Sequence, residues 1–398
     1  MEKWNKATLS DVCDLVAGFA FKSKDFGSYE SRVIKIANII PPSVDMASLV
    51  GVDLEKYDKP KLEKYIVRKG DVVFAMTGAT IGKIGRIEYG QAYINQRVLL
   101  FRPKEIIDQD YLYYVLQQHK FLQYVVNHVD SESAQPNISA GTVGKYQIYL
   151  PPMDLQKKIG RVLRTYDELI ELNRKINENL LVQAKTIKKQ WVATNKAGYE
   201  MLPLAEVATI NPDTYSPKEA WEFVNYLDTS SITDGFVADI QHIVPSSEKL
   251  PSRARRKVAA GDVLFSTVRP NQNHFGIISD PLPNTLASTG FADIRSKTPL
   301  VCNELIYLCL TEGDFIEKMQ QLAEQSTSTF PSIKPSDLGA CQIPCPKDES
   351  SNVFNDTLKT LFSLIAANFR ENNSLGAMRD ALLPKLMSGE LDVSAIDL

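Results

Sequence analysis

A glycine-rich stretch of the chain has some residue types of a phosphate-binding loop. The segment GATIGKIG, residues 78–85, combines three glycines with Lys83. A P-loop separates its first two conserved glycines by four residues and follows its lysine with serine or threonine, whose hydroxyl reaches magnesium. Here one residue is missing between the glycines, and Ile84 follows the lysine. We therefore interpret the stretch as a tight turn between two strands.

Other residues that could do chemistry also lack the required spacing. An amino-methyltransferase needs Asn or Asp before Pro-Pro and an aromatic residue, but the two Pro-Pro pairs occur in IPPS and LPPM. No paired-carboxylate nuclease motif is convincing. Asp71 and Asp262 follow glycines at matched places, where turn residues before strands are expected. The sequence therefore predicts a protein that is not itself an enzyme.

The cysteine and histidine content predicts neither a metal site nor a disulfide framework. The chain has five cysteines and four histidines, and Cys341 and Cys345 have no second pair and no histidine near them in sequence. Sparse, odd-numbered cysteines are typical of reduced thiols. The start, MEKWNKATLSDV, lacks the apolar core of a secretory signal, and no apolar run reaches about 18 residues. We expect a cytoplasmic protein without a cofactor of its own.

The sequence repeats itself once, at an offset of about 195 residues, which indicates a duplicated domain. Each match is weak alone, but four matches in one order are hard to obtain by chance. The matching segments are TLSDVCDLVAG with PLAEVATIN, VRKGDVVFAMTGATIGKIGRI with VAAGDVLFSTVRPNQNHFGII, YLYYVLQQHKFL with LIYLCLTEGDFI, and QPNISAGTVGKYQIYLPP with FPSIKPSDLGACQIPCPK.

Each repeat is predicted to contain about 150 residues of mixed structure and then a long helix. Short runs such as DVVFAM and RVLLFRP predict strands bounded by Gly and Pro. The run DQDYLYYVLQQHKFLQYVV predicts one helix, with Asp108 or Asp110 near its N-terminus. Proline-rich ends, PP and PCP, then close each domain. The expected boundaries are domains at 1–150 and 199–346, and long helices within 151–198 and 347–398.

Both long helices have a heptad pattern, which predicts that they pack along a seam. Two seams in the first helix contain Ile159, Leu163 and residues at steps of seven from them, and the second helix repeats the pattern. Asn173 and Asn368 occupy the same seam position. If the helices pack antiparallel about a pseudo-twofold axis, these two side chains lie close together and fix the register. The alternative is two solvent-facing asparagines.

These features predict an α+β fold. Two tandem, pseudo-symmetric α/β domains are each followed by a long helix, and the two helices pack as an antiparallel coiled coil.

The layout and several motifs resemble the specificity subunit of type I restriction-modification enzymes. The resemblance covers essentially the whole chain. It rests on LPPMDLQKKIGRVLRTYDELIELNRKINENL at the first long helix, MRDALLPKLMSGELDV near the end, and GDVVFAMTGATIGKIG and SAQPNIS in the first repeat. The second repeat departs from the first, with VRPNQNHFG in place of MTGATIGKIG. Such divergence is expected of two domains that read different DNA sequences.

The resemblance implies that each repeat is a target recognition domain for one half of a split, asymmetric DNA site. The helices would set the spacing between the halves and bind two modification subunits, which carry S-adenosylmethionine and methylate adenine. Restriction subunits that use ATP and magnesium would join this complex. The rival interpretations are a coiled-coil scaffold that binds only proteins and a stand-alone methyltransferase.

Residues that could contact DNA lie at matched places in the repeats. The net charge of −3 is unlike that of a generic nucleic-acid binder, but KLPSRARRKV holds five basic residues. Phosphate contacts are predicted for Lys83, Arg86, Arg253, Arg255, Arg256 and Lys257. Base contacts are predicted for Thr77, Thr80, Gln96, Arg97, Gln135 and Asn137 in the first repeat, and for Arg269, Asn271, Gln272, Asn273, Ser328 and Lys334 in the second. For each, the alternative is an ordinary surface residue of a loop, and for Asn137 a backbone cap.

Overall fold

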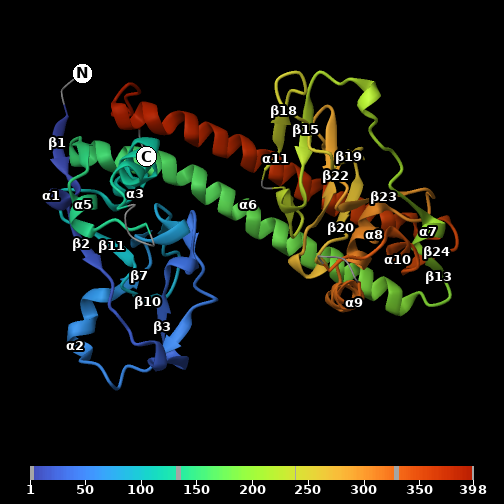
Figure 1. Cartoon of the computed structure of the whole chain (residues 1–398), viewed down its shortest axis with the longest axis horizontal. Coiled ribbons are helices and arrows are strands. Elements are labelled where there is room, and N and C mark those ends of the chain that lie inside the picture. Colours follow the sequence, from blue (N-terminus) through green and yellow to red (C-terminus); the bar gives the residue numbers. More distant parts are fainter. Residues whose placement is uncertain (1–3, 131–135, 238, 327–330, 397–398) are drawn as a thin grey trace. The chain divides into compact units, whose positions relative to one another are not determined.

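A computed structural model of the chain describes residues 4–130, 136–237, 239–326 and 331–396 (Figure 1). The chain divides into two units. The first contains residues 1–170 and 373–398, and the second contains residues 171–372. Each unit therefore combines one sequence repeat with segments of both long helices. Within the described residues, none of the helices has the length and apolar character needed to cross a membrane.

The first unit is built on two sheets and a short ribbon. The larger sheet has the order β2-β11-β8-β9-β5-β4, and the smaller one has the order β6-β3-β10-β7 with a parallel pair between β3 and β10. The strands are β1 (Asn5–Thr8), β2 (Cys13–Ala17), β3 (Phe26–Ile34), β4 (Ile39–Ile40), β5 (Ser43–Val44), β6 (Val50–Val52), β7 (Ile66–Arg68), β8 (Val72–Ala75), β9 (Ile84–Arg86), β10 (Gln91–Ile94), β11 (Val98–Pro103) and β12 (Gln147–Leu150). The helices are α1 (Leu9–Val12), α2 (Lys59–Leu62), α3 (Gln109–Gln117), α4 (His119–Asn127) and α5 (Ala140–Gly144).

The second unit repeats the core of this topology. Its two four-stranded sheets have the orders β14-β23-β20-β21 and β18-β15-β22-β19, and β15 and β22 of the second sheet form a parallel pair. The strands are β13 (Tyr199–Pro203), β14 (Ala208–Ile210), β15 (Val224–Leu227), β16 (Ile232–Thr233), β17 (Phe236–Val237), β18 (Gln241–Ile243), β19 (Ala254–Lys257), β20 (Asp262–Ser266), β21 (Phe275–Ile278), β22 (Thr285–Ser288), β23 (Phe291–Ser296) and β24 (Gln342–Pro346). The helices are α7 (Leu204–Val207), α8 (Asn303–Leu310), α9 (Gly313–Glu324) and α10 (Pro335–Gly339).

The central strand of each repeat is buried on both faces because its side chains alternate between two cores. In β8, Phe74 packs in the core that contains α3, whereas Val73 and Ala75 pack in the core of the smaller sheet. In β20, Phe265 packs in the core that contains α8, whereas Leu264 packs in a separate core with residues of β15 and β22. Successive side chains of a strand point to opposite faces, so consecutive apolar residues, VVFA in β8 and VLF in β20, suit this position.

The predicted helix over residues 108–126 is two helices, α3 and α4. Asp108 caps α3, as predicted, since its carboxylate accepts a hydrogen bond from the Tyr111 amide at 2.9 Å. Gln118 has extended backbone angles (φ −65°, ψ 139°) and separates the two helices. The apolar spacing continues across this residue, which is why the sequence predicted a single helix.

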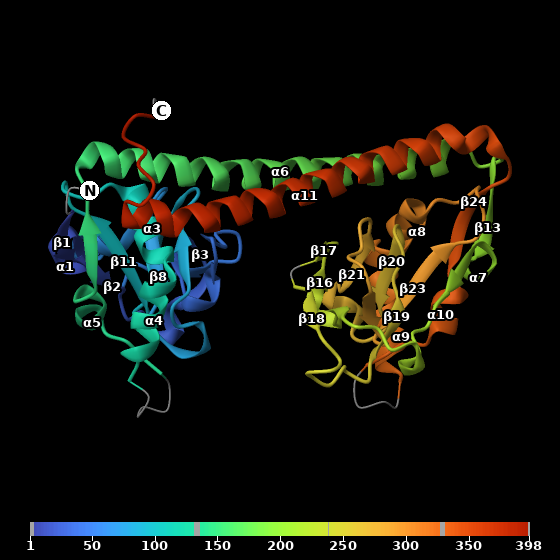
Figure 2. The same ribbon diagram turned by 90° about the horizontal axis from the view of Figure 1, so that it is seen from above.

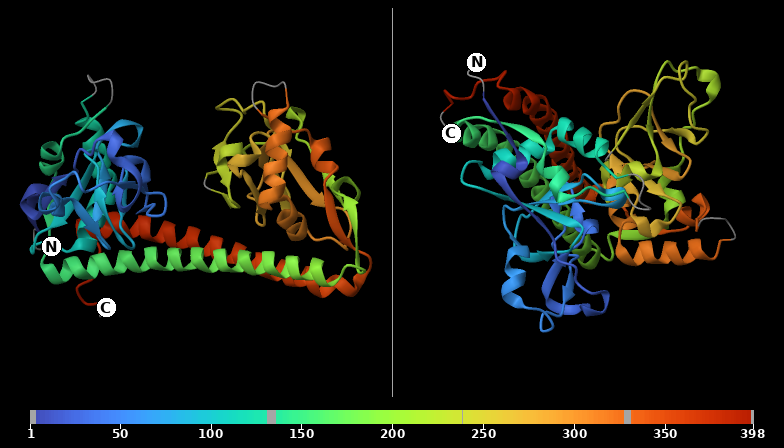
Figure 3. Two further views of the ribbon diagram at one scale, coloured as in Figure 1. Left: turned by 90° about the horizontal axis from the view of Figure 1, so that it is seen from below. Right: turned by 60° about the vertical axis from the view of Figure 1, so that its left-hand side comes forward.

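The long helices are α6 (Met153–Thr194) and α11 (Asn352–Ser388), with 42 and 37 residues. In each unit their segments run antiparallel and lie side by side (Figures 2 and 3). In the first unit, Ile159 and Leu386 are buried in the core of the repeat. In the second, Trp191 stacks on Phe354 with ring centroids 4.4 Å apart. The heptad prediction of a packed seam is confirmed.

The asparagines of the seam form two pairs, and the predicted pairing of Asn173 with Asn368 is wrong. The Asn173 Nδ2 donates to the Asn372 Oδ1 at 3.0 Å, and the Asn368 Nδ2 donates to the Asn177 Oδ1 at 2.7 Å. Each predicted partner is thus displaced by four residues, about one helical turn. At the offset of 195 residues, Asn173 is equivalent to Asn368, and Asn177 is equivalent to Asn372. The two pairs are therefore related by the pseudo-twofold symmetry of the helices, and the symmetry axis passes between them.

A second polar cluster is buried in the second repeat. The Arg295 guanidinium donates to both carboxylate oxygens of Asp262, at 2.7 and 2.8 Å. Asp293, on the neighbouring strand, is fully buried. Burial raises the pKa of Asp293, and the carboxylate of Asp262 raises it further. The folded chain therefore holds the proton of Asp293 more tightly than the unfolded chain does.

We predict that the Asn177→Ala substitution destabilises the helix pair by about 1–3 kcal/mol, because it leaves the Asn368 amide without its acceptor. In the double variant, Asn368→Ala should destabilise the helix pair by less than it does alone, because its hydrogen bond to Asn177 is already absent. A coupling energy of about 0.5 kcal/mol or more is expected from a double-mutant cycle of urea unfolding. Asn179→Ala is the control, since Asn179 is exposed on the same helix. Additive effects would show that the pair makes no net contribution.

The Asp293 carboxyl predicts a pH dependence of stability. Because the pKa of Asp293 is higher in the folded chain than in the unfolded chain, its protonated carboxyl group stabilises the folded state. This stabilisation is complete below the pKa of the unfolded chain, about 3.9, and is lost as the pH rises through the pKa of the folded chain. Asp293→Asn removes this loss, so the stability of the variant relative to the original chain should increase between about pH 5 and pH 9. Urea unfolding at a series of pH values measures it, with exposed Asp280→Asn as the control. Parallel curves would contradict the assignment.

Candidate nucleic-acid interface

Three segments of the first repeat meet where β8 ends. The Met76 amide donates to the Arg97 carbonyl, and the Met76 carbonyl accepts from the Ile138 amide, both at 3.0 Å. The Gly78 amide donates to the Pro136 carbonyl at 3.0 Å. These bonds join residues 77–83, 95–97 and 136–139, which we call loop cluster 1. The segment 77–83 links the antiparallel strands β8 and β9, which confirms the interpretation of GATIGKIG as a turn between strands.

The second repeat has the same arrangement where β20 ends. The Thr267 amide donates to the Gly290 carbonyl at 2.8 Å, and the Thr267 carbonyl accepts from the Ile333 amide at 2.9 Å. The Arg269 amide donates to the Pro331 carbonyl at 2.9 Å. We call residues 267–274, 288–290 and 331–334 loop cluster 2. Each of these bonds has a counterpart in loop cluster 1, so the two clusters share a backbone framework.

Most of the predicted contacts in the first repeat lie together in loop cluster 1. Lys83, Gln96 and Arg97 are exposed, and Asn137 is half-buried. The half-buried Thr80 donates its hydroxyl to the Thr77 carbonyl at 3.1 Å and so stabilises the loop. Gln135 lies outside the described residues.

Two predictions in the first repeat are wrong because the side chains are buried. Thr77 and Arg86 are each 2% exposed. The Arg86 guanidinium forms an ion pair with the Asp110 carboxylate at 2.9 Å and lies 4.0 Å from the Tyr113 ring centroid. Its charge thus links β9 to α3 inside the repeat. Basic residue type alone could not distinguish this structural role from a phosphate contact.

The predicted base contacts of the second repeat also come together. Arg269, Asn271, Gln272 and Lys334 are exposed in loop cluster 2, and Asn273 is half-buried there. The short 3₁₀ helix η7 (Pro270–Gln272) carries two of them. Ser328 lies outside the described residues.

The basic run of the second repeat divides between solvent and interior. Arg253 is exposed and joins loop cluster 2, because its carbonyl accepts from the Thr289 amide at 2.8 Å. The half-buried Arg255 donates its Nε to the Ser252 carbonyl at 3.1 Å. Both remain candidates for phosphate contacts.

The other two residues of the run that were predicted to contact phosphate, Arg256 and Lys257, do not fit that role. Burial lowers the pKa of Arg256, and the carboxyl of Asp293 partly offsets this effect. Lys257 forms an ion pair with Glu219 at 2.6 Å. Because these residues follow one another along β19, they face opposite sides of the sheet. The structure therefore argues against Arg256 and Lys257 as phosphate contacts.

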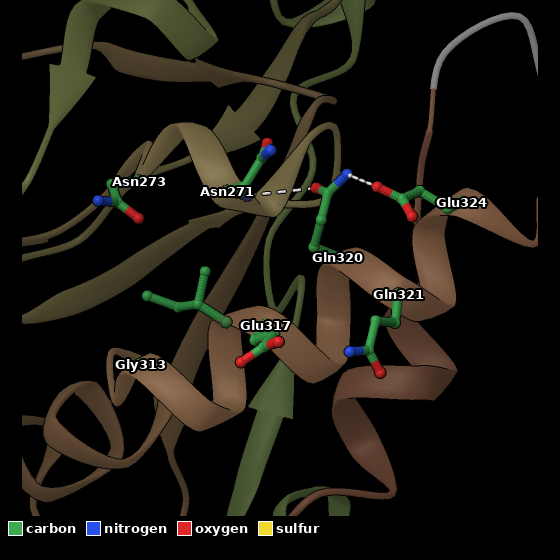
Figure 4. A pocket seen from close by; sticks show the side chains of 8 residues that line it. Asn271, Asn273, Gly313, Glu317, Gln320, Gln321 and Glu324 are labelled. Carbon is green, nitrogen blue, oxygen red and sulfur yellow. Dashed lines mark hydrogen bonds between the residues drawn. The ribbon is translucent and has the colours of Figure 1, made fainter. Parts of the chain in front are cut away.

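Sequence reasoning missed a polar pocket between η7 and α9, with a volume of about 490 Å³ (Figure 4). The Asn271 backbone amide donates to the Gln320 Oε1 at 3.3 Å, and the Gln320 Nε2 donates to the Glu324 Oε1 at 2.8 Å. The available signal was the helical spacing of polar residues in the second repeat. The pocket is lined by Asn271, Asn273, Gly313, Ile316, Glu317, Gln320, Gln321 and Glu324.

The site chemistry is that of hydrogen bonding and charge. The described residues contain no group of three or more His, Cys, Asp or Glu side chains placed to hold a metal ion. Burial raises the pKa of the Cys13 and Cys302 thiols to about 12, which disfavours the nucleophilic thiolate. Exposed amides, hydroxyls and guanidinium groups are instead the groups that recognise base edges and phosphates.

Comparison with known proteins agrees with this chemistry. Residues 1–182 match the family described as the type I restriction modification DNA specificity domain. The MjaIX specificity subunit of a type I restriction enzyme from Methanocaldococcus jannaschii is 26% identical over 316 residues, which cover 74% of this chain and 72% of that one. The HindI specificity subunit from Haemophilus influenzae is 26% identical over 139 residues, 35% of this chain and 30% of its own.

A solved structure supports the fold along the whole chain. The S subunit of a type I restriction-modification system from M. genitalium has a TM-score of 0.57 and 15% sequence identity, and the match covers 98% of this chain and 97% of that one. Residues 1–182 are therefore similar to the DNA specificity domain of type I restriction modification enzymes, and the whole chain is similar in fold to an S subunit of such a system.

Proposed function

We propose that this chain reads a bipartite, asymmetric DNA site and directs adenine methylation or restriction by partner subunits. The observation that carries the proposal is the pair of loop clusters, which share a backbone framework but differ in their side chains. Sequence is read by side chains that reach base edges, whereas a common framework sets their position. Two frameworks with different side chains suit two different half-sites.

The exposed residues of each cluster divide into two roles. Lys83 in the first repeat and Arg253 in the second are suited to phosphate contacts, because they are exposed beside the loops. Gln96 in cluster 1 and Asn271 in cluster 2 carry amide groups, which pair with adenine edges. Since phosphate contacts give affinity without sequence information, the amides and arginines of the loops are the proposed source of specificity.

The chemistry of the complex would come from its partners. We infer that two modification subunits supply S-adenosylmethionine and methylate adenine, and that restriction subunits supply the nuclease and the use of ATP and magnesium. The chain itself would be non-catalytic, which is consistent with its lack of a methyltransferase or nuclease motif. The long helices, α6 and α11, would act as the spacer and as the docking surface for the modification subunits.

The test is to express the chain with its cognate modification subunit and to map adenine methylation by single-molecule sequencing of the DNA. The expected result is a split, asymmetric motif that is absent from cells with the modification subunit alone. Replacing residues 199–346 by those of another specificity subunit should change only one half of the motif. An assembled complex that creates no motif would show that the chain is a scaffold without DNA readout.

The burial of Arg86 allows a sharper test with two basic residues of one repeat. Lys83→Ala should lower the slope of log affinity against log salt by roughly one unit, because one phosphate contact is lost. Its stability should change by less than about 0.5 kcal/mol. Arg86→Ala should instead destabilise the chain by about 1–3 kcal/mol, since the Asp110 carboxylate and the Tyr113 ring lose their partner.

The measurement is binding of the assembled complex to a duplex that contains its methylation motif, across a series of salt concentrations, beside urea unfolding of the chain. If Lys83→Ala destabilises the fold and leaves the salt slope unchanged, the assignment of roles is wrong.

A further inference from the structure

Two residues of loop cluster 2 have backbone conformations that glycines have in loop cluster 1. The φ angles of Arg269 and Asn273 are +48° and +56°. At the matching places, Gly78 and Gly82 have φ angles of +69° and +88°. Positive φ is uncommon for residues other than glycine, and asparagine tolerates it better than arginine does.

Hydrogen bonds establish that these positions match one another. The Gly78 and Arg269 amides donate to the equivalent carbonyls of Pro136 and Pro331. At the other end of the loop, the Ala75 amide donates to the Lys83 carbonyl at 2.9 Å, and the Ser266 amide donates to the His274 carbonyl at 2.8 Å. Gly82 and Asn273 directly precede Lys83 and His274. The two loops thus have the same length between equivalent bonds.

Arginine is a costly choice for this position. A left-handed conformation brings Cβ too close to the following carbonyl oxygen, which disfavours residues other than glycine. Arg269 also precedes Pro270, and a residue before proline is normally extended. Glycine would fit without this strain. Residues in strained conformations cluster at functional sites, where the surrounding structure holds them in place.

The surroundings of the second position also differ between the repeats. A Cβ atom on Gly82 would lie 2.8 Å from the Leu122 Cδ1 of α4, so the loop and the helix are in close contact there. In the second repeat, Asn273 lies beside the polar pocket formed with α9 (Figure 4). The second repeat thus has a side chain and a pocket where the first has a glycine and a leucine.

The chemistry of the pocket favours a base edge over a phosphate. Glu317 and Glu324 contribute carboxylates, which would repel a phosphate, while Gln320, Gln321 and the loop asparagines contribute amides. Amide and carboxylate oxygens accept hydrogen bonds from the exocyclic amino groups of adenine and cytosine. An arginine at the end of the same loop can donate two bonds to a guanine edge.

We propose that Arg269 and Asn273 are the specificity-determining residues of the second repeat, kept in left-handed conformations because their side chains read bases. Arg269 recognises guanine, and Asn273 with the pocket recognises a base that carries an amino group, adenine being the best match. This inference rests on the proposed function. It goes further by distinguishing the residues of the loop that contact bases from those that only maintain its backbone conformation.

The test compares three substitutions by glycine, each at a left-handed position of the second repeat. Arg269→Gly and Asn273→Gly remove the proposed readers, whereas Ala220→Gly is the matched control, with φ of +49° and no polar side chain. Each variant is expressed with the cognate modification subunit. The methylation motif is mapped by single-molecule sequencing, and the thermal unfolding midpoint of each purified chain is measured.

The expected result separates recognition from stability. Each glycine variant should unfold at the same temperature as the original chain or a few degrees higher, because strain is relieved. Arg269→Gly and Asn273→Gly should each reduce discrimination at one base pair of one half-site by roughly 5- to 150-fold, the value of one good side-chain pair. Ala220→Gly should leave the motif unchanged.

The contrary outcomes are distinct. If the original chain directs a motif and neither loop variant changes it, the inference is overturned and the proposed function stands. If both loop variants unfold several degrees lower than the control variant, Arg269 and Asn273 have a structural role and the inference is also overturned. If the original complex directs no motif, the proposed function fails and this inference fails with it.

Discussion

The backbone hydrogen bonds of Met76 and Thr267 determine where the loops of each repeat can lie. Each residue sits at the end of a central strand and bonds through both its amide and its carbonyl to segments distant in sequence. All four of these bonds join backbone atoms. The exposed side chains of a loop cluster can therefore differ without changing these bonds, while the buried Thr267 hydroxyl adds a further bond to the Gly290 carbonyl. This independence suits the proposed reading of two different half-sites. A buried central strand makes this anchor rigid, since β8 and β20 are covered on both faces.

The long helices are held by a related combination of apolar and polar contacts. Apolar seam residues such as Ile159 and Leu358 supply burial, whereas the two asparagine pairs supply directed hydrogen bonds. An apolar seam alone would tolerate a shift by one heptad, but an unpaired buried amide would oppose it. We infer that the asparagines specify the register in which the antiparallel helices pack. Because Asn173 and Asn177 of α6 are equivalent to Asn368 and Asn372 of α11, a bond between Asn173 and Asn372 implies the matching bond between Asn368 and Asn177.

Much of this arrangement could be predicted from the sequence. Duplication, heptad spacing and strand-forming runs each depend on local patterns, so the fold class and the helix seam followed from them. The partner of Asn173 could not be predicted, because the crossing point of two helices depends on the packing of whole side chains. The break at Gln118 was missed for a similar reason, since the apolar spacing is uninterrupted there.

The candidate interface was predicted in part. Loop position and residue type identified exposed residues such as Lys83 and Asn271, but they could not separate these from the buried Arg86. Burial depends on contacts with α3, a segment distant in sequence. The pocket beside η7 was missed because its lining comes from two segments about 40 residues apart.

The open space at Gly78 has an evolutionary consequence. A Cβ atom added at this position would meet no other atom within 4 Å. The first repeat thus has room for a new side chain at the very position where the second has an arginine. A single codon change there would add a side chain without a steric clash, at the cost of a strained left-handed backbone like that of Arg269. Under the proposed function, such a change would alter one half of the target and leave the other repeat as it is, so the duplicated architecture lets the two halves diversify separately.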